Sequence, residues 1–271
     1  MIDIDTTRYR VTPDAFAGLA EISPEPTLDL EKRALKTANK ALNKEIERQQ
    51  ELMWAEQKHR LLVVLQAIDT GGKDGTIRNV FDGVNPLGVK VASFKKPSAE
   101  ELRRDYLWRV HQHVPADGEI TIFNRSHYED VLVVKVHGYA DPPTIEKRYD
   151  HINAFEKLLV DEGTTVIKIF LHISKDEQRQ RLQDRLDEPD KNWKFSSADL
   201  EERKHWDAYQ AVFNEMLQRT STPWAPWYVI PANQKKFRNL VLSQILVETL
   251  RNFNMQWPSA EPGLKKIKIP K

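Results

Sequence analysis

The 271-residue chain contains no cysteine, so it can form no disulfide and hold no zinc through thiolates. It has no apolar run long enough to cross a bilayer, and its first residues lack the apolar core of a signal peptide. Its formal net charge is only +1, so no strong overall field marks a polyanion partner. There is no internal repeat and no low-complexity segment. We therefore expect a cytoplasmic globular protein whose ligands must be found from local motifs.

Short apolar runs alternate with helical patterns along the chain. The runs predict strands at 61–65, 89–94, 119–123, 165–173 and 224–231. Helical spacing predicts helices at 29–59, 75–81, 98–113, 144–162 and 235–254. The first of these would be capped by Thr27 or Asp29, and the third by Ser98. With 40% apolar and 30% charged residues, the chain is typical of one large α/β domain.

The most informative stretch is 67–76, Ala-Ile-Asp-Thr-Gly-Gly-Lys-Asp-Gly-Thr, between a predicted strand and a predicted helix. Strand, glycine turn, lysine and helix is the layout of a P-loop, which holds phosphate by its N–H groups and lysine. The stretch departs from G-x-x-x-x-G-K-[ST] at Ala67 and Asp74. An ordinary strand-to-helix turn is the alternative. The predicted phosphate-binding residues here are Gly71, Gly72, Lys73, Asp74, Gly75, Thr76 and, on the helix, Arg78.

Basic residues are concentrated just after this motif. From Lys73 to Arg109 there are eight Lys or Arg against five Asp or Glu. Ligands of open α/β sheets lie beyond the carboxyl ends of the strands. This rule favours Lys95 and Lys96, which end the second predicted strand, as further phosphate ligands. For each of them, surface charge without a ligand remains the alternative.

The third predicted strand ends in Asn124 and Arg125. In P-loop enzymes such a neighbouring strand commonly ends in an Asp of the Mg²⁺ shell. Asn124 brings no charge, so Asp69 inside the P-loop is the best-placed metal ligand. Arg125 can clamp phosphates with both arms of its guanidinium. Glu129 and Asp130 follow at a predicted helix start, where acidic residues also simply favour the helix dipole. The predicted nucleotide-binding residues are Asn124, Arg125, Glu129 and Asp130.

Residues 174–207 predict a lid. A helix carries Arg181 and Arg185 on one face, a polar loop with two aromatic residues follows, and a second helix begins. Nucleotide kinases build lids in this order, and the lid arginines close over the transferring phosphates. Alternatively, the arginines pair with acidic neighbours on a solvated face. The P-loop upstream favours the lid.

Four segments together resemble the family-2 polyphosphate kinases: 67–76, 124–130 (Asn-Arg-Ser-His-Tyr-Glu-Asp), 171–181 (Leu-His-Ile-Ser-Lys-Asp-Glu-Gln-Arg-Gln-Arg) and 190–194 (Asp-Lys-Asn-Trp-Lys). The resemblance implies a thymidylate-kinase-like α/β P-loop fold, with a central parallel sheet in a three-layer sandwich. It also implies phosphoryl transfer between inorganic polyphosphate and nucleotides with Mg²⁺. By position, Lys73 would hold phosphates, Asp69 the metal and Arg125 the transferring group, with lid contacts from Arg181 and Arg185.

The same resemblance extends to the subclass and the domains. Asn124 departs from relatives with Asp there and, with the Ile-Asp-Thr-Gly-Gly loop, resembles class III, whose members accept AMP and ADP. The expected domains are an arm and long helix (1–58), a P-loop kinase domain with the lid (59–255) and a basic tail (256–271). The expected partners are polyphosphate, AMP, ADP and ATP, with no nucleic acid or membrane, in a homo-oligomer (dimer or tetramer).

Two other functions remain open at this point. An ATP-dependent nucleoside monophosphate kinase would use the same fold and leave polyphosphate inert. A non-catalytic polyanion-binding protein would bind in a steeply salt-dependent way without turnover.

Overall fold

The computed structural model describes residues 2, 4–264 and 267–270. Its strands are β1 (Arg60–Ala67), β2 (Val89–Ser93), β3 (Ile120–Asn124), β4 (Thr164–His172) and β5 (Trp227–Pro231). They form one sheet in the order β2-β3-β1-β4-β5, and each neighbouring pair is parallel. The carboxyl ends of the strands therefore meet at one edge of the sheet. The predicted α/β fold with a central parallel sheet is confirmed.

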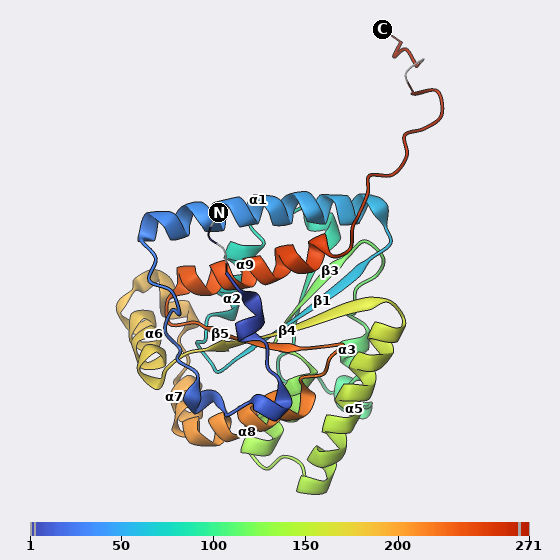
Figure 1. Cartoon of the computed structure of the whole chain (residues 1–271). Helices are drawn as coiled ribbons and strands as arrows, with labels where there is room; N and C mark the ends of the chain where they lie inside the picture. Colours follow the sequence, from blue (N-terminus) through green and yellow to red (C-terminus); the bar gives the residue numbers. More distant parts are fainter. Residues whose placement is uncertain (1, 3, 265–266, 271) are drawn as a thin grey trace.

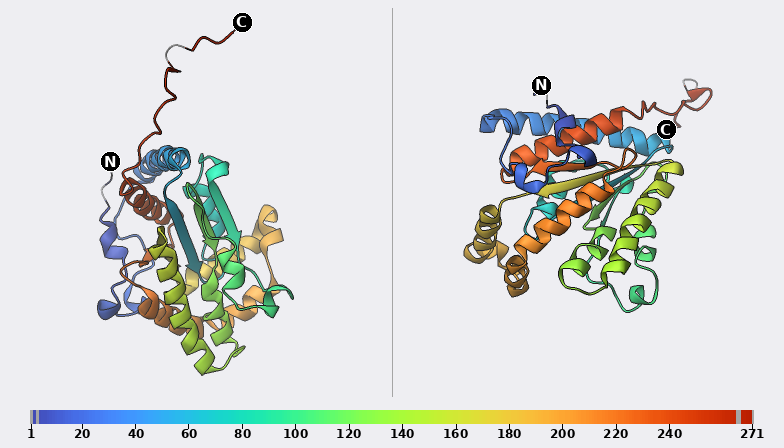
Figure 2. Two further views of the ribbon diagram at one scale, coloured as in Figure 1. Left: turned by 90° about the vertical axis from the view of Figure 1, so that its right-hand side faces the viewer. Right: turned by 60° about the horizontal axis from the view of Figure 1, so that its bottom comes forward.

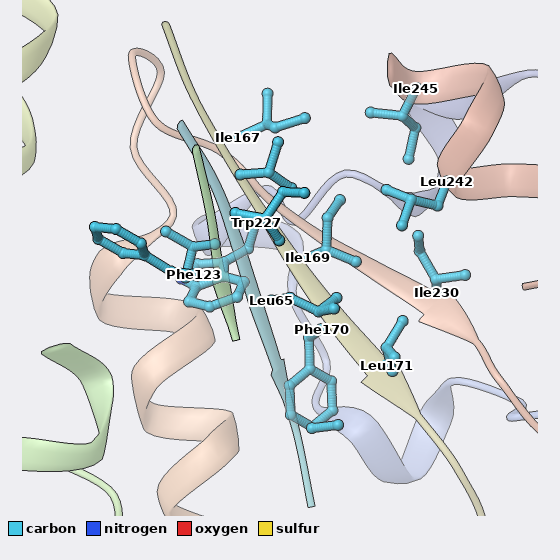
Figure 3. Packing of buried hydrophobic residues seen from close by; sticks show 14 of the residues in the cluster. Leu65, Phe123, Ile167, Ile169, Phe170, Leu171, Trp227, Ile230, Leu242 and Ile245 are labelled. Carbon is cyan, nitrogen blue, oxygen red and sulfur yellow. The ribbon is translucent and has the colours of Figure 1, made fainter. Parts of the chain in front are cut away.

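Helices cover both faces of the sheet (Figure 1). α1 (Lys32–Glu56), α2 (Lys73–Val80) and α9 (Lys235–Arg251) lie on one face, and α5 (Pro142–Asp161) and α8 (Trp206–Thr220) lie on the other. β1 and β4 are buried along almost their whole length, which explains their continuous apolar sequences. Figure 3 shows Leu242 and Ile245 of α9 directed toward Ile169 and Ile230 of the sheet. The core thus fills the space between sheet and helices.

The path of the chain places the loop after β1 at a reversal of strand order. From β1 the chain goes to the edge strand β2, returns to β3, and then crosses to β4 on the other side of β1. Open α/β sheets bind ligands at such a switch point, beyond the carboxyl ends of the strands. α6 (Lys175–Asp187) and α7 (Ser197–Lys204) follow β4 near this edge; the short helices α3 (Trp108–His111) and α4 (Val133–Val136) precede and follow β3.

The N-terminal arm packs on the core, and three short 3₁₀ helices interrupt its extended backbone: Thr6–Tyr9, Pro13–Ala15 and Leu19–Glu21. Arg10 forms an antiparallel bridge with Tyr228 of β5, and the Val11 N–H donates to the Trp227 carbonyl over 2.8 Å. Ile4, also in the arm, is buried. The arm thereby covers part of the β5 edge of the sheet.

At the other end, residues 256–264 and 267–270 are exposed and form no strand. Figure 2 shows this segment leaving the body of the molecule. Residues 265, 266 and 271 of the predicted basic tail lie outside the described residues. None of the helices described is both long enough and apolar enough to cross a bilayer.

The cap predicted for α1 is wrong. Glu31 occupies the N-cap position and its side chain makes no capping bond. Thr27 instead shares a hydrogen bond with the Tyr9 hydroxyl at 2.6 Å. The chain between Asp29 and the helix is extended, so both predicted caps lie too far before the first turn.

Two other helix starts also differ from the predictions. Ser98 and Glu101 form the expected reciprocal capping bonds, but only a 3₁₀ turn at Glu101–Arg103 follows. Asp105 stops it, because its carboxylate accepts from the N–H groups two and three residues later and starts a new turn. The helix predicted at 144–162 begins two residues earlier, because Pro142 and Pro143 are the first two residues of α5, where their missing N–H groups cost nothing.

Candidate active site

A groove of about 1100 Å³ opens at the carboxyl edge of the sheet. The P-loop forms its floor, the ends of β2 and β3 form one wall, and the segment 185–199 forms the other. Seven basic side chains line it: Lys73, Arg78, Lys95, Lys96, Arg125, Arg185 and Lys194. Three acidic side chains line it as well: Asp69, Asp74 and Asp199. A chain with almost no net charge therefore carries one strongly positive groove, which is suited to a polyanion.

The loop after β1 has the compact form of a P-loop despite its irregular sequence. Thr70 and Gly72 have φ values of 63° and 98°, and α2 begins directly afterwards at Lys73. Gly71 is required, because a Cβ there would lie 2.5 Å from the Ala67 Cβ. A Cβ at Gly75 would meet nothing within 4 Å, since this residue faces the groove. The loop therefore leaves the N-terminus of α2 accessible to an anion.

Thr76 is the one predicted phosphate-binding residue of this stretch that does not line the groove. Its side chain is buried, and its hydroxyl donates to the Gly72 carbonyl over 3.0 Å. Thr76 therefore supports the loop from inside the first turn of α2.

Lys73 lies at the floor of the groove and is only 8% exposed. Its ammonium group donates to the Ala67 carbonyl over 3.1 Å. Burial, followed by the nearby positive charge of Arg125, lowers the pKa of Lys73 to about 8, although Asp69 opposes the shift. Burial therefore disfavours the charge on this ammonium group, and an anionic ligand would stabilise it.

The end of β3 holds the two carboxylates of the P-loop. The Arg125 guanidinium pairs with Asp69 and, over 3.3 Å, with Glu129. The Asn124 amide donates to Asp74 Oδ1 over 2.8 Å. Four of the predicted site residues thus meet at the groove, while Glu129 lies behind Arg125, beside a small cavity.

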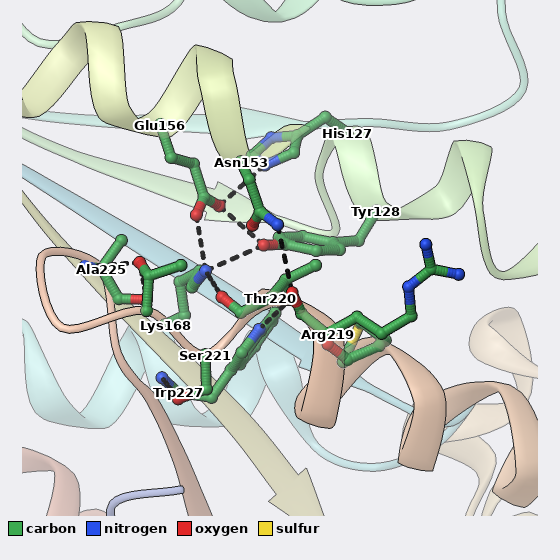
Figure 4. A network of polar contacts seen from close by, with 12 residues as sticks. His127, Tyr128, Asn153, Glu156, Lys168, Arg219, Thr220, Ser221, Ala225 and Trp227 are labelled. Atoms are coloured by element: carbon green, nitrogen blue, oxygen red, sulfur yellow. Dashed lines mark hydrogen bonds and ion pairs between the residues drawn. The ribbon is translucent and has the colours of Figure 1, made fainter. Parts of the chain in front are cut away.

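A buried polar network anchors the segment that carries Arg125 (Figure 4). The Lys168 ammonium on β4 donates to Glu156 of α5 over 2.5 Å and to the Thr220 carbonyl over 2.6 Å. Glu156 also contacts the His127 ring at 3.1 Å and accepts from the Tyr128 hydroxyl at 2.8 Å. Because His127 and Tyr128 follow closely after Arg125 in the chain, this network holds the end of β3 in place.

Asp130 does not reach the groove. It lies beside two arginines, Arg109 at 3.7 Å and Arg148 at 3.8 Å. Burial raises the pKa of Asp130 to about 6, although both arginines oppose the shift. The structure thus separates Asp130 from Glu129, which was predicted with it as nucleotide-binding.

Of the two predicted lid arginines, Arg185 lines the groove. Its guanidinium donates to Asp199 over 2.7 Å and to the Lys194 carbonyl over 3.0 Å, which joins α6 to α7. The intervening 3₁₀ segment, Pro189–Lys194, places Trp193 at the groove with 78% of its surface exposed. The segment 185–199 therefore covers one side of the phosphate loop.

Arg181 lies one turn earlier on α6 and is buried outside the groove lining. Its guanidinium donates to Glu177 over 2.7 Å, to the Thr70 carbonyl over 3.2 Å and to the Ala232 carbonyl over 2.6 Å. In this structure Arg181 therefore contacts the phosphate loop from behind.

Sequence reasoning missed Arg238, which lies on α9 near the back of Gly72. The two residues are separated by 166 positions, so no local motif could join them. The bond from the Gln178 amide to the Asp69 carbonyl was not predicted either.

The donor set fits Mg²⁺ if the ion is shared with a phosphate ligand. No group of three or more His, Cys, Asp or Glu side chains that could hold a metal occurs among the described residues. Mg²⁺ at phosphate sites is typically held by one or two carboxylates together with substrate phosphates and water. Asp69 and Asp74 provide two carboxylates at the groove.

The comparison with protein families decides the identity of this site. The family model described as Polyphosphate kinase 2 (PPK2) matches residues 29–258. The chain belongs to this family. The predicted family and the predicted enzyme class, a polyphosphate kinase, are thereby confirmed.

Named members of the polyphosphate kinase 2 family resemble the chain over most of its length. The AMP/ADP-polyphosphate phosphotransferase of Meiothermus ruber is 57% identical over 264 residues, which cover 97% of this chain and 99% of the relative. The ADP-polyphosphate phosphotransferase of Rhodopseudomonas palustris is 44% identical and covers 80% of this chain and 79% of its own length. The crystal structure of polyphosphate kinase 2 from Arthrobacter aurescens TC1 has a TM-score of 0.93 at 40% identity, covering 97% of this chain and 95% of that one.

Proposed function

We propose that this polyphosphate kinase transfers phosphoryl groups between inorganic polyphosphate and nucleotides, and that it accepts both AMP and ADP. The basic groove above the P-loop carries this proposal, because it concentrates seven cationic side chains where a helix N-terminus is open. The name of the 57%-identical relative supports AMP and ADP as acceptors.

In this proposal, polyphosphate lies along Lys73, Arg78, Lys95 and Lys96. Asp69, together with phosphate oxygens, would hold Mg²⁺, which neutralises charge on the reacting phosphates when bound. This assignment leaves the end of β3 for the nucleotide phosphate.

The protein has little covalent chemistry to perform. The acceptor is itself a phosphate and is anionic at neutral pH, so no general base is required. Phosphoryl transfer passes through a loose, in-line transition state, which is catalysed by positioning and by neutralising charge. The planar guanidinium of Arg125 can bind two oxygens of the transferring group in place of Asp69 and Glu129. Arg185 and Lys194 would close the groove from the lid and exclude water.

Product analysis tests the proposal directly. The pure protein is mixed with Mg²⁺, polyphosphate and either AMP or ADP, and nucleotides are separated by chromatography. We expect ADP and ATP from AMP, and ATP from ADP; the Lys73→Ala variant should fold but form neither. ATP from ADP alone would remove AMP as an acceptor. ADP formed only from ATP plus AMP would make the protein an ordinary nucleotide kinase. Near-parental turnover by Lys73→Ala would contradict the site.

We also propose Mg²⁺ as the metal, a cytoplasmic location and a homo-oligomer, either a dimer or a tetramer. The long exposed face of α1 and the family support the oligomer. Activity lost in EDTA should return with Mg²⁺, and analytical ultracentrifugation should find a mass of two or four chains.

A further inference from the structure

Side chains of another element hold the phosphate loop from behind. Gln178 and Arg181 of α6 donate to the carbonyl oxygens of Asp69 and Thr70, over 3.0 and 3.2 Å. Gln178 is 1% exposed and Arg181 is 7% exposed, so water does not compete with either donor for its carbonyl. Two successive peptides of the loop are thus fixed by buried donors.

Arg238 of α9 completes this arrangement from the other side. One of its nitrogens, Nη1, donates to the Gly72 carbonyl over 3.4 Å, while Nε and Nη2 donate to Asn239 Oδ1 over 3.0 and 2.8 Å. The approach depends on Gly72, because a Cβ there would lie 2.4 Å from Nη1. The bond to Asn239 fixes the plane of the guanidinium against the loop.

Arg238 is 2% exposed, and among the described residues no carboxylate forms an ion pair with it. Burial first, and then the guanidinium of Arg181, lower the pKa of Arg238 to about 9, so it keeps its charge at neutral pH. A buried charge without a counterion destabilises a protein. An anion bound in the P-loop would supply the missing negative charge.

The held carbonyls also affect the face of the loop that meets the ligand. In a trans peptide the C=O and the N–H point in opposite directions, so the carbonyls of Asp69 and Gly72, when held behind the loop, turn their peptide N–H groups toward the front. The N–H that shares a peptide with the Thr70 carbonyl, that of Gly71, instead donates to the Ile68 carbonyl over 2.9 Å, so Arg181 fixes the loop itself. A donor on the carbonyl also polarises that peptide and strengthens its N–H as a donor. The Gly72 carbonyl shares its peptide with the N–H of Lys73, the first residue of α2.

We propose that Gln178 and Arg238, together with Arg181, are positioning residues for phosphoryl transfer. They fix and polarise the peptides of the phosphate loop, and the bound phosphate balances the charge of Arg238. This inference rests on the proposed function, since the phosphate is that of polyphosphate or the nucleotide. Arg203 of α7 donates to Gln178 Oε1 over 2.7 Å, so the same amide joins the lid to the loop.

Thermal denaturation with tripolyphosphate and Mg²⁺ tests the proposal. Arg238→Met removes the charge, and Gln178→Met removes one donor at nearly constant length. Arg251→Met is the matched control, because Arg251 lies on the same helix with 51% of its side chain exposed, and among the described residues its only ion pair is with Glu45. Melting temperatures with and without ligand are compared, together with kcat and the KM for polyphosphate.

We expect Arg238→Met without ligand to melt at or above the parental temperature, because an unbalanced buried charge has been removed. Its stabilisation by tripolyphosphate should shrink, and its KM for polyphosphate should rise about tenfold or more. Arg238→Lys should recover part of the loss. Gln178→Met should show a smaller loss in the same direction, and Arg251→Met should match the parent.

A purely structural role makes the opposite prediction: a lower melting temperature without ligand and an unchanged shift on adding tripolyphosphate. That result would overturn the proposal. If Arg238→Met did not fold, Gln178→Met would decide. A melting-temperature shift with tripolyphosphate equal to the parental shift would contradict the proposal, and a smaller shift would support it. If the parent itself showed no shift, the proposed function would fail, and this inference with it.

Discussion

The pH dependence of Lys73 offers the most direct test of the phosphate site. Burial lowers the pKa of this lysine from its ordinary 10.5 to about 8. A tenfold change in a protonation equilibrium is worth about 1.4 kcal/mol, so charging Lys73 costs the folded protein about 3 kcal/mol. Because the folded-state pKa is the lower one, this cost acts in full below about pH 8 and disappears as the pH rises toward 10.5.

A bound phosphate should reverse this shift. Opposite charges in contact typically move a pKa by about 1 to 3, so polyphosphate should raise the pKa of Lys73 well above its ligand-free value. NMR of protein labelled at lysine Cε can follow the titration, and the resonance is assigned by its loss in Lys73→Arg. We expect a midpoint of about 8 without ligand and a higher one with polyphosphate.

The steady-state kinetics should depend on the protonation of Lys73 in the same way. The pH profile of kcat/KM reports the free enzyme, so it should fall above about pH 8, whereas kcat, which reports the complex, should stay level to higher pH. Lys96→Arg is the control. It keeps the charge at an exposed position of the groove wall, so the pH profiles of kcat/KM and of kcat should keep their parental shape. A Lys73 resonance that titrated near 10.5 without ligand, or that polyphosphate left unmoved, would refute the reasoning.

Three further predictions concern other parts of the site. Asp69→Asn should lower kcat by about a hundredfold or more at a nearly unchanged melting temperature, because it removes the carboxylate proposed for Mg²⁺; steady-state kinetics and calorimetry measure both. Lys168→Met should lower the free energy of unfolding in urea by about 3 to 5 kcal/mol, because Glu156 stays buried without its ammonium partner. Adding Glu156→Leu should recover part of that loss, and a double variant no more stable than Lys168→Met would contradict this account. Asp199→Ala should speed amide exchange in α7 and raise the KM for polyphosphate, because Arg185 loses its partner; unchanged exchange would show that this bond does not hold the lid.

The sequence predicted the parts of the fold that depend on periodicity. The five strands lie where apolar runs placed them, and the inward residues of α5 are buried as its spacing required: Ile145, Tyr149, Ile152, Phe155 and Leu159. His172, the last residue of β4, is likewise buried, and its ring contacts the Ile22 carbonyl at 3.0 Å. Periodicity succeeds here because burial on one face of a regular element is a local property.

The failures have a different physical origin. Spacing placed Arg181 and Arg185 on one face of α6, but could not show that one faces the phosphate loop and the other faces α7. A local turn at Asp105 overrode the capping residues at Ser98, although those residues made their expected bonds. No local sequence pattern pointed to Arg238, because Gly72, whose carbonyl it contacts, lies 166 positions away. Contacts between distant elements depend on the assembled fold, and no single segment encodes them.

The packing of the N-terminal arm has a consequence for how this chain reaches its native state. The hydroxyl of Thr6 bonds Glu248 of α9, a separation of 242 residues, and Val11 pairs with Trp227. α1 likewise packs along α9. The arm therefore meets its partners only after residues 227–251 have been synthesised. Such long-range closure slows folding, so we expect the docking of the arm and α1 to be a late step. Until then the apolar face of α1 stays uncovered, and during synthesis it is a surface on which nascent chains can associate.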